Sequence, residues 1–458
     1  MISKNISARE TALDTIYRVH ESESYANLLL PKVLEKSGLS KRDRAFTTEL
    51  VYGTLRTQGT LDWILSQYAS RDLSQIPLRA LDILRLGCYQ LVFLSRVPAH
   101  AVCFEAVELA KKFFHRGMAT FVNGLLRTVE RRKLELPWPK YEEDPVNFIS
   151  LKFSHPRWLV RVWAENLGLE ETKKLCEANN RRPQITLRTN TLRISRDDLF
   201  VVLQEQGLNV EKSSVTSESL IIKDTGSLSA LPQFKEGLFF VQDGSSMIAS
   251  YVVSPRSGEV IIDSCAAPGG KSTHLAQLMG NRGRIIAVDI HPKRLNLIQE
   301  NVKRLGTDIV ETVQADATKL EDVIELRPLL KAKVDRILID APCSGLGVLA
   351  RRPDARWRKS PDQIEELSIL QSKLLESAAP FVKSGGVLVY SVCTITHQEG
   401  VEVVQGFLRN HPEFVLDDAV PYLPESLRLE EPYKWAQLLP HKHGTDGLFI
   451  ARLVKKLA

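Results

Sequence analysis

The chain has 458 residues, of which 43% are hydrophobic and 25% charged, and its formal net charge is +6. A single hydrophobic core seldom grows beyond about 250–300 residues, so this length predicts more than one domain. No apolar run approaches the roughly 20 residues that span a bilayer, and the first residues lack the apolar core of an export signal, so we expect a cytoplasmic protein without a membrane partner.

The six cysteines form no C-x-x-C pair and no paired spacing, which excludes a disulfide scaffold and predicts no metal site. The charge is unevenly distributed. Residues 1–135 hold 20 Lys and Arg against 14 Asp and Glu, whereas the rest of the chain holds 41 of each. This excess fits a domain that binds a polyanion, although a basic helical domain without a nucleic-acid partner has the same composition.

Residues 1–135 predict an all-helical domain of about six helices. Apolar residues recur there at helical spacing, in segments such as SARETALDTIYRVH and MATFVNGLLRTVERR. Ser7 followed by Glu10 is typical of a capping box at a helix start. Residues 136–147 lose this periodicity and contain three prolines, which indicates a linker.

Residues 148–236 predict a small α+β module, because a helical stretch (HPRWLVRVWAENLG) is followed by strand-like runs around the helix DDLFVVLQEQG. Residues 237–458 alternate apolar runs of strand length with helical segments. The strand runs are EVIIDS, RIIAVDI, VETVQAD, DRILIDAP and GGVLVYSV. This pattern predicts a multidomain chain that ends in an α/β, Rossmann-like domain with a doubly wound, mostly parallel sheet, whose ligands bind at the carboxyl ends of the strands.

The run EVIIDSCAAPGGKSTHLAQLM predicts a strand, a glycine turn and a helix, an arrangement that lets backbone N–H groups approach a ligand. It is not a phosphate-binding P-loop, because Cys265 stands where that motif requires glycine. Asp289 and Asp316 end the next two strands, and an acid at such a position accepts hydrogen bonds from ribose hydroxyls. These acids favour a nucleoside ligand over a triphosphate, and at this point a nicotinamide dehydrogenase remains an alternative.

Three cysteines, Cys265, Cys343 and Cys393, each follow a predicted parallel strand. A lone buried cysteine is usually a small core residue, but three at one edge of a sheet indicate chemistry. A thiolate can add to carbon 6 of a cytosine and thereby activate carbon 5 toward methylation. Asp340, three residues before Cys343, is placed to bond ring nitrogen 3.

The segments DSCAAPGGKSTHLA, DAPCSGLG and YSVCTITHQEG resemble, in order and spacing, the signature motifs of the RNA cytosine-5 methyltransferases of the NOL1/NOP2/Sun family. RTNTLR, GLFFVQDGSS and DGLFIARL also look like segments of that family. The first 135 residues resemble the NusB-type helical RNA-binding fold, so the resemblance covers essentially the whole chain. The third motif departs at Val392, where threonine is common, and at His397 and Gln398, where an acidic residue is often nearby. It retains Cys393 and Glu399, so these departures put substrate preference in doubt more than activity.

By this resemblance Cys393 carries a covalent adduct with the base and Cys343 assists its breakdown, with Asp340 and Lys271 completing the catalytic set. Lys271 would also face the substrate base. The resemblance implies S-adenosyl-L-methionine as the cofactor. Its contacts would be Cys265, Ala266, Ala267, Pro268, Gly269, Gly270, Lys271, Asp289, Asp316 and Asp340.

The run RRPDARWRK at residues 351–359 carries five basic side chains and one tryptophan. Arginines neutralise phosphates and an aromatic ring stacks on a base, so the run predicts an RNA contact. The alternative is a solvated basic loop that Trp357 anchors in the core. The candidate RNA-binding residues are Arg351, Arg352, Arg356, Trp357 and Arg358.

We therefore expect a monomeric enzyme that forms 5-methylcytosine in 16S rRNA, free or partly assembled, since a base already outside a stack is cheaper to extract. The choice of 16S rRNA follows from the resemblance of the N-terminal domain. A methyltransferase acting on tRNA or 23S rRNA is an alternative, because the catalytic motifs do not encode the target. A non-catalytic RNA-binding or antitermination factor is another, although the presence of both Cys343 and Cys393 argues against it.

Overall fold

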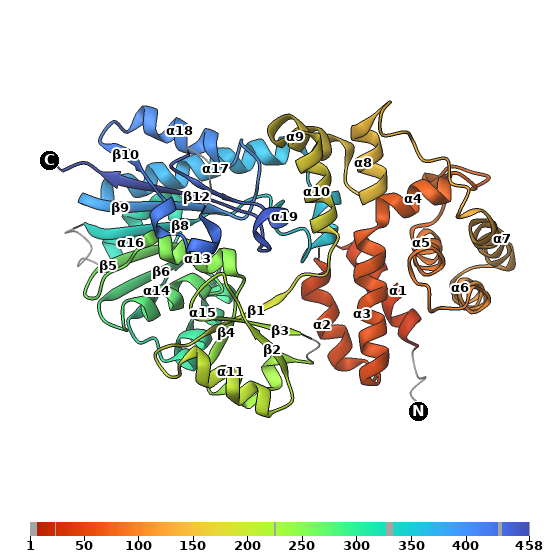
Figure 1. Cartoon of the computed structure of the whole chain (residues 1–458), viewed down its shortest axis with the longest axis horizontal. Coiled ribbons are helices and arrows are strands. Elements are labelled where there is room, and N and C mark those ends of the chain that lie inside the picture. The colour runs from red at the N-terminus through yellow and green to blue at the C-terminus, as the bar shows by residue number, and fades with distance from the viewer. Residues whose placement is uncertain (1–6, 23, 224–225, 327–332, 429–432, 458) are drawn as a thin grey trace. The chain divides into compact units, whose positions relative to one another are not determined.

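The computed structural model describes residues 7–22, 24–223, 226–326, 333–428 and 433–457. The chain divides into two compact units (Figure 1). The first contains Met1–Arg182 together with Leu349–Arg358, and the second contains Pro183–Val348 and Lys359–Ala458. The chain therefore leaves the second unit shortly after Cys343, contributes ten residues to the first unit, and returns. In the described ranges no helix is both long and apolar enough to cross a membrane.

The N-terminal part of the first unit is helical, as predicted, and its helices enclose one hydrophobic core. α3 and α4 are separated only by Thr57, so their apolar residues form one continuous pattern in the sequence. The helices are α1 (Ala8–Glu21), α2 (Ala26–Lys36), α3 (Lys41–Arg56), α4 (Gln58–Ser66), α5 (Leu78–Phe93), α6 (Ala99–Phe113) and α7 (Arg116–Arg132), with a 3-10 turn η1 (Leu73–Gln75).

The expected start of α1 is confirmed, because Oγ of Ser7 accepts the backbone N–H of Glu10 at 3.2 Å. The carboxylate of Glu10 pairs with Lys112 of α6, so it ties α1 to a distant helix. The cap at Ser7 therefore fixes where α1 begins, and the ion pair helps to hold α1 against α6.

Three more helices belong to the first unit: α8 (Pro145–Phe153), α9 (Arg157–Leu167) and α10 (Leu169–Asn179). No helix or strand occupies residues 133–144, which include most of the expected linker. The boundary between the compact units lies after Arg182, whereas the sequence placed these helices with the α+β module that follows. The periodicity of a helix shows which of its faces is apolar but not which unit covers that face.

The second unit begins with an antiparallel sheet in the order β2-β3-β1-β4, against which α11 packs. Its elements are β1 (Ile185–Thr189), α11 (Arg196–Glu205), β2 (Asn209–Lys212), β3 (Ser219–Lys223), η2 (Leu228–Ala230), α12 (Pro232–Lys235) and β4 (Phe239–Val241). The predicted strands around Thr186 and Ile221 are confirmed as β1 and β3.

The larger sheet has the order β10-β12-β9-β8-β5-β6-β7, and its strands from β5 to β9 are parallel, as predicted. β12 pairs antiparallel with β9, β10 and β11, a feature the sequence did not indicate. The strands are β5 (Val260–Ser264), β6 (Arg284–Asp289), β7 (Val310–Gln314), β8 (Val334–Asp340), β9 (Val382–Val392), β10 (Phe414–Asp417), β11 (Ala436–Leu438) and β12 (Leu448–Lys455).

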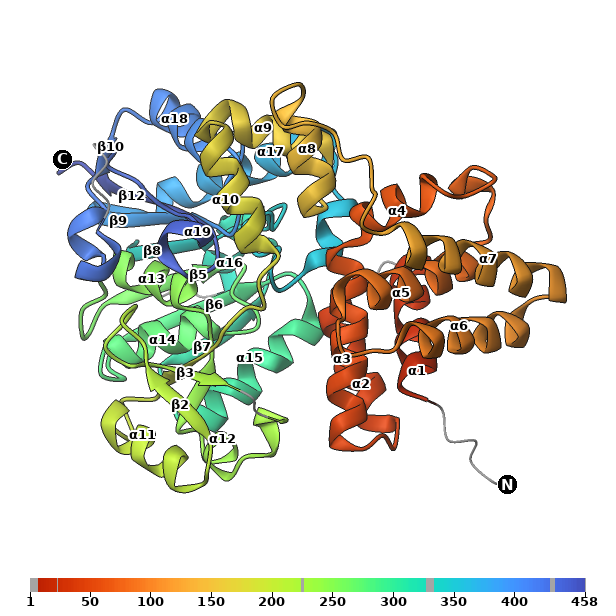
Figure 2. The ribbon, with the colours of Figure 1, turned by 45° about the vertical axis from the view of Figure 1, so that its right-hand side comes forward.

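Helices cover both faces of this sheet (Figures 1 and 2). α13 (Gly244–Val253), α14 (Gly270–Leu278) and α15 (Pro292–Leu305) pack on one face, and α16 (Leu320–Leu326), α17 (Pro361–Ala378) and α18 (Val401–Asn410) on the other. Alternate residues of β5 enter different cores, since Ile261 packs on one face and Ile262 on the other. From β5 the chain continues to β6 on one side, whereas from β8 it continues to β9 on the opposite side. The carboxyl ends of the neighbouring strands β5 and β8 therefore form the topological switch point, where ligands bind in such sheets.

Short elements complete the second unit: η3 (Ala317–Lys319), η6 (Ala379–Phe381), η7 (Val420–Tyr422), η8 (Glu425–Leu427) and α19 (Pro440–His443). The 3-10 turn η5 (Pro353–Trp357) lies in the segment that joins the first unit.

Candidate active site

The carboxyl ends of adjacent parallel strands place the two predicted catalytic cysteines together. Cys343 follows β8 and Cys393 follows β9, and these strands pair in register up to Asp340 and Ser391. Their sulfur atoms lie 3.2 Å apart. Both side chains are half-buried and neither forms a disulfide, so the site holds two thiols in direct contact.

Contact between the thiols affects their protonation. The hydrogen bond with Cys393 is the main cause that raises the pKa of Cys343 well above its usual value, followed by burial and by the negative charges of Cys393 and Glu399. Two adjacent thiols resist losing both protons, because the second thiolate would face the charge of the first. The second proton of the pair is therefore harder to remove than the first.

Lys271, at the start of α14, forms the cationic side of the site. Its Nζ lies 2.6 Å from Oδ2 of Asp340, and Oδ1 of Asp340 accepts the Ser391 hydroxyl at 3.0 Å. Burial lowers the pKa of Lys271, but Asp340, and to a lesser degree Cys393, raise it more, so that the pKa lies above its usual value. Lys271 is therefore a charged ammonium, and two of the predicted catalytic residues form one ion pair.

Glu399 is fully buried and joins the two cysteine loops. Its carboxylate accepts the Ser344 N–H at 2.7 Å, the Gln371 side-chain amide at 3.1 Å, and the Thr396 hydroxyl at 2.9 Å. Behind Cys393, the N–H of Gly347 donates to the Cys393 carbonyl at 3.0 Å. Sequence reasoning noted that Glu399 was present but gave it no role, because only the fold brings it next to Ser344.

The glycine turn after β5 has the conformation that its residues suggest. Cys265 and Gly269 both lie in the left-handed region, with φ of 61° and 94°, and the Ala267–Pro268 peptide is cis. A Cβ on Gly269 would lie 3.1 Å from the Ile298 side chain of α15, so glycine lets the turn approach that helix closely. Cys265 is half-buried and belongs to this turn rather than to the thiol pair.

Burial and the carboxylates of Asp340, Asp289 and Asp263 raise the pKa of Cys265 to about 12. Asp263, at the end of β5, is fully buried, and burial is the main cause that raises its pKa to about 7. Cys265 is therefore a neutral thiol at physiological pH, unlike the nucleophile that the chemistry requires.

The predicted nucleoside-binding acids have different surroundings. Asp289 is 3% exposed, and its carboxylate accepts the Ala267 N–H at 3.3 Å and the His291 N–H at 3.0 Å. It thus holds the glycine turn at the end of β6. Asp316 accepts the backbone N–H of Thr318 at 2.9 Å and caps η3. Both acids have a local structural role in addition to any role toward a ligand.

Arg188 of β1 is a supporting residue that sequence reasoning missed. Its buried guanidinium donates to the Gly270 carbonyl at 2.6 Å and to the Thr273 hydroxyl at 2.9 Å. Burial lowers the pKa of Arg188 to about 9. The smaller sheet therefore supports the turn that opens α14, and the presence of Arg188 in the family-like segment RTNTLR was the only signal for it.

Arg356, one of the predicted RNA contacts, has no exposed surface. Arg356 is fully buried inside the first unit and donates to the Ser154 carbonyl at 2.8 Å and to Oδ1 of Asn180 at 2.9 Å. Longer contacts reach the carbonyls of Arg56 and Phe153. The ends of α3, α8 and α10 meet at this guanidinium, which is favourable because the carboxyl end of a helix carries a partial negative charge.

The neighbours of Arg356 are also engaged within the first unit. Arg358 donates to the carbonyls of Val19 at 2.7 Å and Ser24 at 2.9 Å, and Trp357 packs on Gly59 so closely that a Cβ there would clash. Arg352 is exposed, and Arg351 is half-buried. Contacts of RNA with Arg351, Arg352, Trp357 and Arg358 remain predictions.

Replacing Arg356 with methionine is expected to destabilise the chain by about 2–4 kcal/mol, because it leaves buried carbonyl groups unpaired. Urea unfolding of the full chain, followed by circular dichroism, measures the loss. The matched control is Arg352→Met at an exposed position of the same segment, for which we expect a change within about 0.5 kcal/mol. Unchanged stability of Arg356→Met with weakened RNA binding would contradict the structural role.

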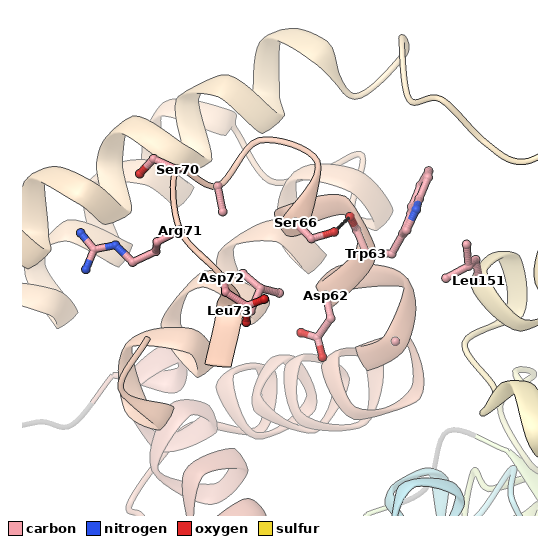
Figure 3. Close-up of a pocket in the computed structure, with 10 residues that line it drawn as sticks. Asp62, Trp63, Ser66, Ser70, Arg71, Asp72, Leu73 and Leu151 are labelled. Atoms are coloured by element: carbon pink, nitrogen blue, oxygen red, sulfur yellow. Dashed lines mark hydrogen bonds between the residues drawn. The ribbon is translucent and has the colours of Figure 1, made fainter. Parts of the chain in front are cut away.

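The first unit also has an open depression of about 670 Å³, shown in Figure 3. None of the candidate site residues lines it, and its charged groups already have partners: Asp62 binds Arg85, Asp72 caps η1, and Arg71 stacks on Phe121. We assign it no ligand. It is lined by Gly59, Asp62, Trp63, Ser66, Ala69, Ser70, Arg71, Asp72, Leu73 and Leu151. In the described part of the chain, no three His, Cys, Asp or Glu side chains are grouped as a metal site.

Three family models match successive parts of the chain. The NusB family matches residues 6–131, the RsmF/B-like ferredoxin-like domain matches residues 155–229, and the 16S rRNA methyltransferase RsmB/F family matches residues 250–454. The NusB match confirms the resemblance proposed for the N-terminal helices, and the third match covers all three signature motifs.

Solved structures show the same architecture. The crystal structure of PH0851 superposes with a TM-score of 0.81 at 29% identity and covers 98% of each chain. The crystal structure of NSun6 from Pyrococcus horikoshii with SFG superposes with a TM-score of 0.58 at 29% identity, covering 66% of this chain and 98% of that one.

Curated relatives match over their full length. The probable ribosomal RNA small subunit methyltransferase B of Bacillus subtilis (strain 168) is 38% identical, covering 99% of this chain and 100% of the relative. The ribosomal RNA small subunit methyltransferase B of Citrobacter koseri is 32% identical, with the same coverage of both chains. The chain therefore belongs to the 16S rRNA methyltransferase RsmB/F family and is an rRNA methyltransferase.

Proposed function

We propose that the chain transfers a methyl group from S-adenosyl-L-methionine to carbon 5 of a cytosine in 16S rRNA, through a covalent adduct with Cys393. The observation that carries this proposal is the 3.2 Å contact between two thiols at the ends of adjacent parallel strands. A pair of thiols can divide the work of attack and proton removal, which a single cysteine cannot do alone.

The attack forms a bond between Sγ of Cys393 and carbon 6 of the base, and the electron pair of the carbon 5–carbon 6 double bond moves toward carbon 5. Negative charge then spreads over the ring to nitrogen 3 and the exocyclic oxygen. The ammonium of Lys271 lies close to Cys393, where a cation would stabilise this charge, and the carboxylate of Asp340 holds that ammonium in place.

The cofactor site would lie at the turn 265–270, with Asp289, Asp316 and Asp340 at the ends of neighbouring strands. These residues fit a nucleoside with a positively charged sulfur, because the carboxylates of Asp340, Asp289 and Asp263 surround the turn at Cys265. When bound, S-adenosylmethionine supplies an electrophilic methyl group. NSun6 of Pyrococcus horikoshii was solved with SFG, an analogue of this cofactor, which supports the proposal.

Release requires removal of the proton from carbon 5. We assign this step to Cys343, whose sulfur lies against that of Cys393. As the proton leaves, the carbon 5–carbon 6 double bond re-forms, the bond from Sγ to carbon 6 breaks, and Cys393 returns as a thiolate. Atoms and charge balance if one proton reaches solvent for each methyl group transferred.

The substrate would be 16S rRNA, free or partly assembled, because extraction of a base from a stack costs a few kcal/mol and is cheaper where the RNA is open. Incubation with labelled S-adenosylmethionine and separate samples of 16S rRNA, 23S rRNA, tRNA and mature small subunits tests this assignment. We expect label in free 16S rRNA, mapped to 5-methylcytosine. Label only in tRNA or 23S rRNA would overturn the substrate, and no label in any RNA would overturn the activity.

Replacing Asp289 with alanine is expected to weaken S-adenosylmethionine binding about 10- to 100-fold, because hydrogen bonds to a charged group contribute about 1.5–3 kcal/mol. The variant loses both a ribose acceptor and the support of the glycine turn. Isothermal titration of the full chain without RNA measures the affinity. The matched control is Asp308→Ala at an exposed position before β7, and equal affinities of the two variants would argue against this site.

A further inference from the structure

The peptide groups on both sides of Cys343 are held by one buried pair of side chains, Glu399 and Gln371. Oε1 of Glu399 accepts the N–H of Ser344 at 2.7 Å, and the Gln371 amide donates to the Pro342 carbonyl at 2.9 Å. The same amide donates to Oε1 of Glu399 at 3.1 Å. Glu399 and Gln371 are both fully buried, so this clamp is shielded from water.

Four donor groups surround the carboxylate of Glu399. Oε1 receives two N–H groups, which can only donate, and Oε2 receives the hydroxyls of Ser344 and Thr396. Tyr390 of β9 donates its hydroxyl to the backbone carbonyl of Glu399 and so fixes the residue from the sheet. A negative charge is thus held beside the peptide that follows Cys343.

The other charges near the thiols lie differently. Lys271 of α14 is close enough to Cys393 for a thiolate there to raise the pKa of its ammonium, and Asp340 of β8 pairs with it. The charge of Glu399 adds to the Cys393 hydrogen bond, burial and the Cys393 charge in raising the pKa of Cys343. A cation thus acts on one sulfur and an anion on the other, although the two sulfurs lie only 3.2 Å apart.

We propose that Glu399 determines which cysteine attacks, by holding the proton that the two thiols share on Cys343 and so leaving Cys393 as the thiolate. Glu399 acts through Ser344 and Gln371 and is a positioning residue. The assignment of attack to Cys393 and release to Cys343 rests on the proposed function. The unequal protonation of the two sulfurs does not rest on it.

The same arrangement explains how Cys343 becomes a base at the right moment. When Sγ of Cys393 bonds to carbon 6, it becomes a neutral thioether and can no longer share a proton as a thiolate. The strongest influence that keeps the proton on Cys343 is then lost. Cys343 releases this proton to water and can accept the proton of carbon 5, after which the bond from Sγ to carbon 6 breaks and the original state returns.

Alkylation of the full chain by iodoacetamide tests the proposal without RNA or cofactor, because thiolates react and thiols do not. The rate of modification is measured between pH 6 and about 9.5 for each cysteine peptide by mass spectrometry, over the range in which free thiols titrate. In the unmodified sequence we expect Cys393 to react first. Equal rates for the two cysteines, or faster reaction of Cys343, would overturn the proposal.

Glu399→Gln removes the charge but keeps the shape, since the new amide can donate to the hydroxyl of Ser344 or Thr396. We expect the preference for Cys393 over Cys343 to fall about tenfold, as a loss of one pKa unit of discrimination implies. Glu399→Asp, which keeps the charge, should restore part of the preference. The matched control is Glu402→Gln at an exposed position three residues later, with the preference unchanged.

An unchanged preference in folded Glu399→Gln would contradict the proposal. If that variant does not fold, equal or faster alkylation of Cys343 in the unmodified chain still overturns the proposal, and a preference in folded Glu399→Asp no greater than that expected for Glu399→Gln contradicts it. A preference for Cys393 together with no methyl transfer to any RNA would leave the proton arrangement intact and overturn the proposed function instead.

Discussion

Replacement of Cys343 by alanine is expected to leave the protein joined to its RNA by a bond that survives denaturation. Attack by Cys393 and methyl transfer do not require the second thiol, but removal of the carbon 5 proton does, so the reaction stops before the bond from Sγ to carbon 6 breaks. Turnover should fall by about 100-fold or more, the usual contribution of a positioned base. Denaturing gel electrophoresis with labelled 16S rRNA detects the trapped complex.

Two comparisons make this result specific. Cys176→Ala changes a fully buried thiol of α10 in the first unit, and we expect it to turn over normally and to trap no RNA. Omission of S-adenosylmethionine should reduce the trapped fraction of Cys343→Ala, because the methylated adduct is the species that cannot eliminate. Normal turnover by Cys343→Ala, without any trapped RNA, would show that another group removes the proton.

Replacement of Cys393 by alanine is expected to abolish turnover, with a loss of at least about a thousandfold, because no other group can form the covalent bond. Transfer of labelled methyl groups to 16S rRNA measures the loss, and Cys176→Ala again serves as the control. Circular dichroism of Cys393→Ala should match that of the unmodified chain.

If the two cysteine variants exchanged phenotypes, with Cys393→Ala trapping RNA and Cys343→Ala inert, the roles assigned to the two sulfurs would be reversed. If both variants retained activity, the thiol pair would have no part in the reaction. Because both substitutions remove one sulfur from the same pair, any general effect on packing should be similar, and a difference between them reports on mechanism.

The strands of the catalytic domain could be predicted because their burial on both faces leaves continuous apolar runs such as EVIIDS and RIIAVDI. Parallel strands expose their carboxyl ends at one edge, so the proximity of Cys343 and Cys393 followed from the sequence once the strands were recognised. The position of β12 was not predicted. Its antiparallel pairing with β9 depends on the order of strands in the sheet, and the local sequence pattern does not encode that order.

The burial of Arg356 could not be predicted from the local sequence pattern. A basic run beside a catalytic cysteine suggests an RNA contact, and nothing in RRPDARWRK reveals that the segment enters the helical unit. The partners of Arg356 are backbone carbonyls at helix ends and the side chain of Asn180, and no sequence motif reveals them. Charge alone therefore predicted a surface role for a side chain that has a buried one.

Glu399 illustrates the same limit within the active site. Its spacing from Cys393 is short, but its main partners, Ser344 and Gln371, lie 55 and 28 residues away in the chain. Sequence reasoning could list the groups that react, because their chemistry restricts the residue type. It could not identify the group that we propose makes the two sulfurs unequal. The sequence does not distinguish Glu399 from other acidic residues, and only the fold buries it beside Ser344.

The attachment of the base to Cys393 is the central claim, and mass spectrometry of the complex trapped by Cys343→Ala tests it most directly. After digestion with nuclease and protease, the account predicts a cross-linked peptide that contains Cys393 and carries a single methylated cytidine nucleotide. A nucleotide attached to any other residue, or a trapped base other than cytosine, would contradict it.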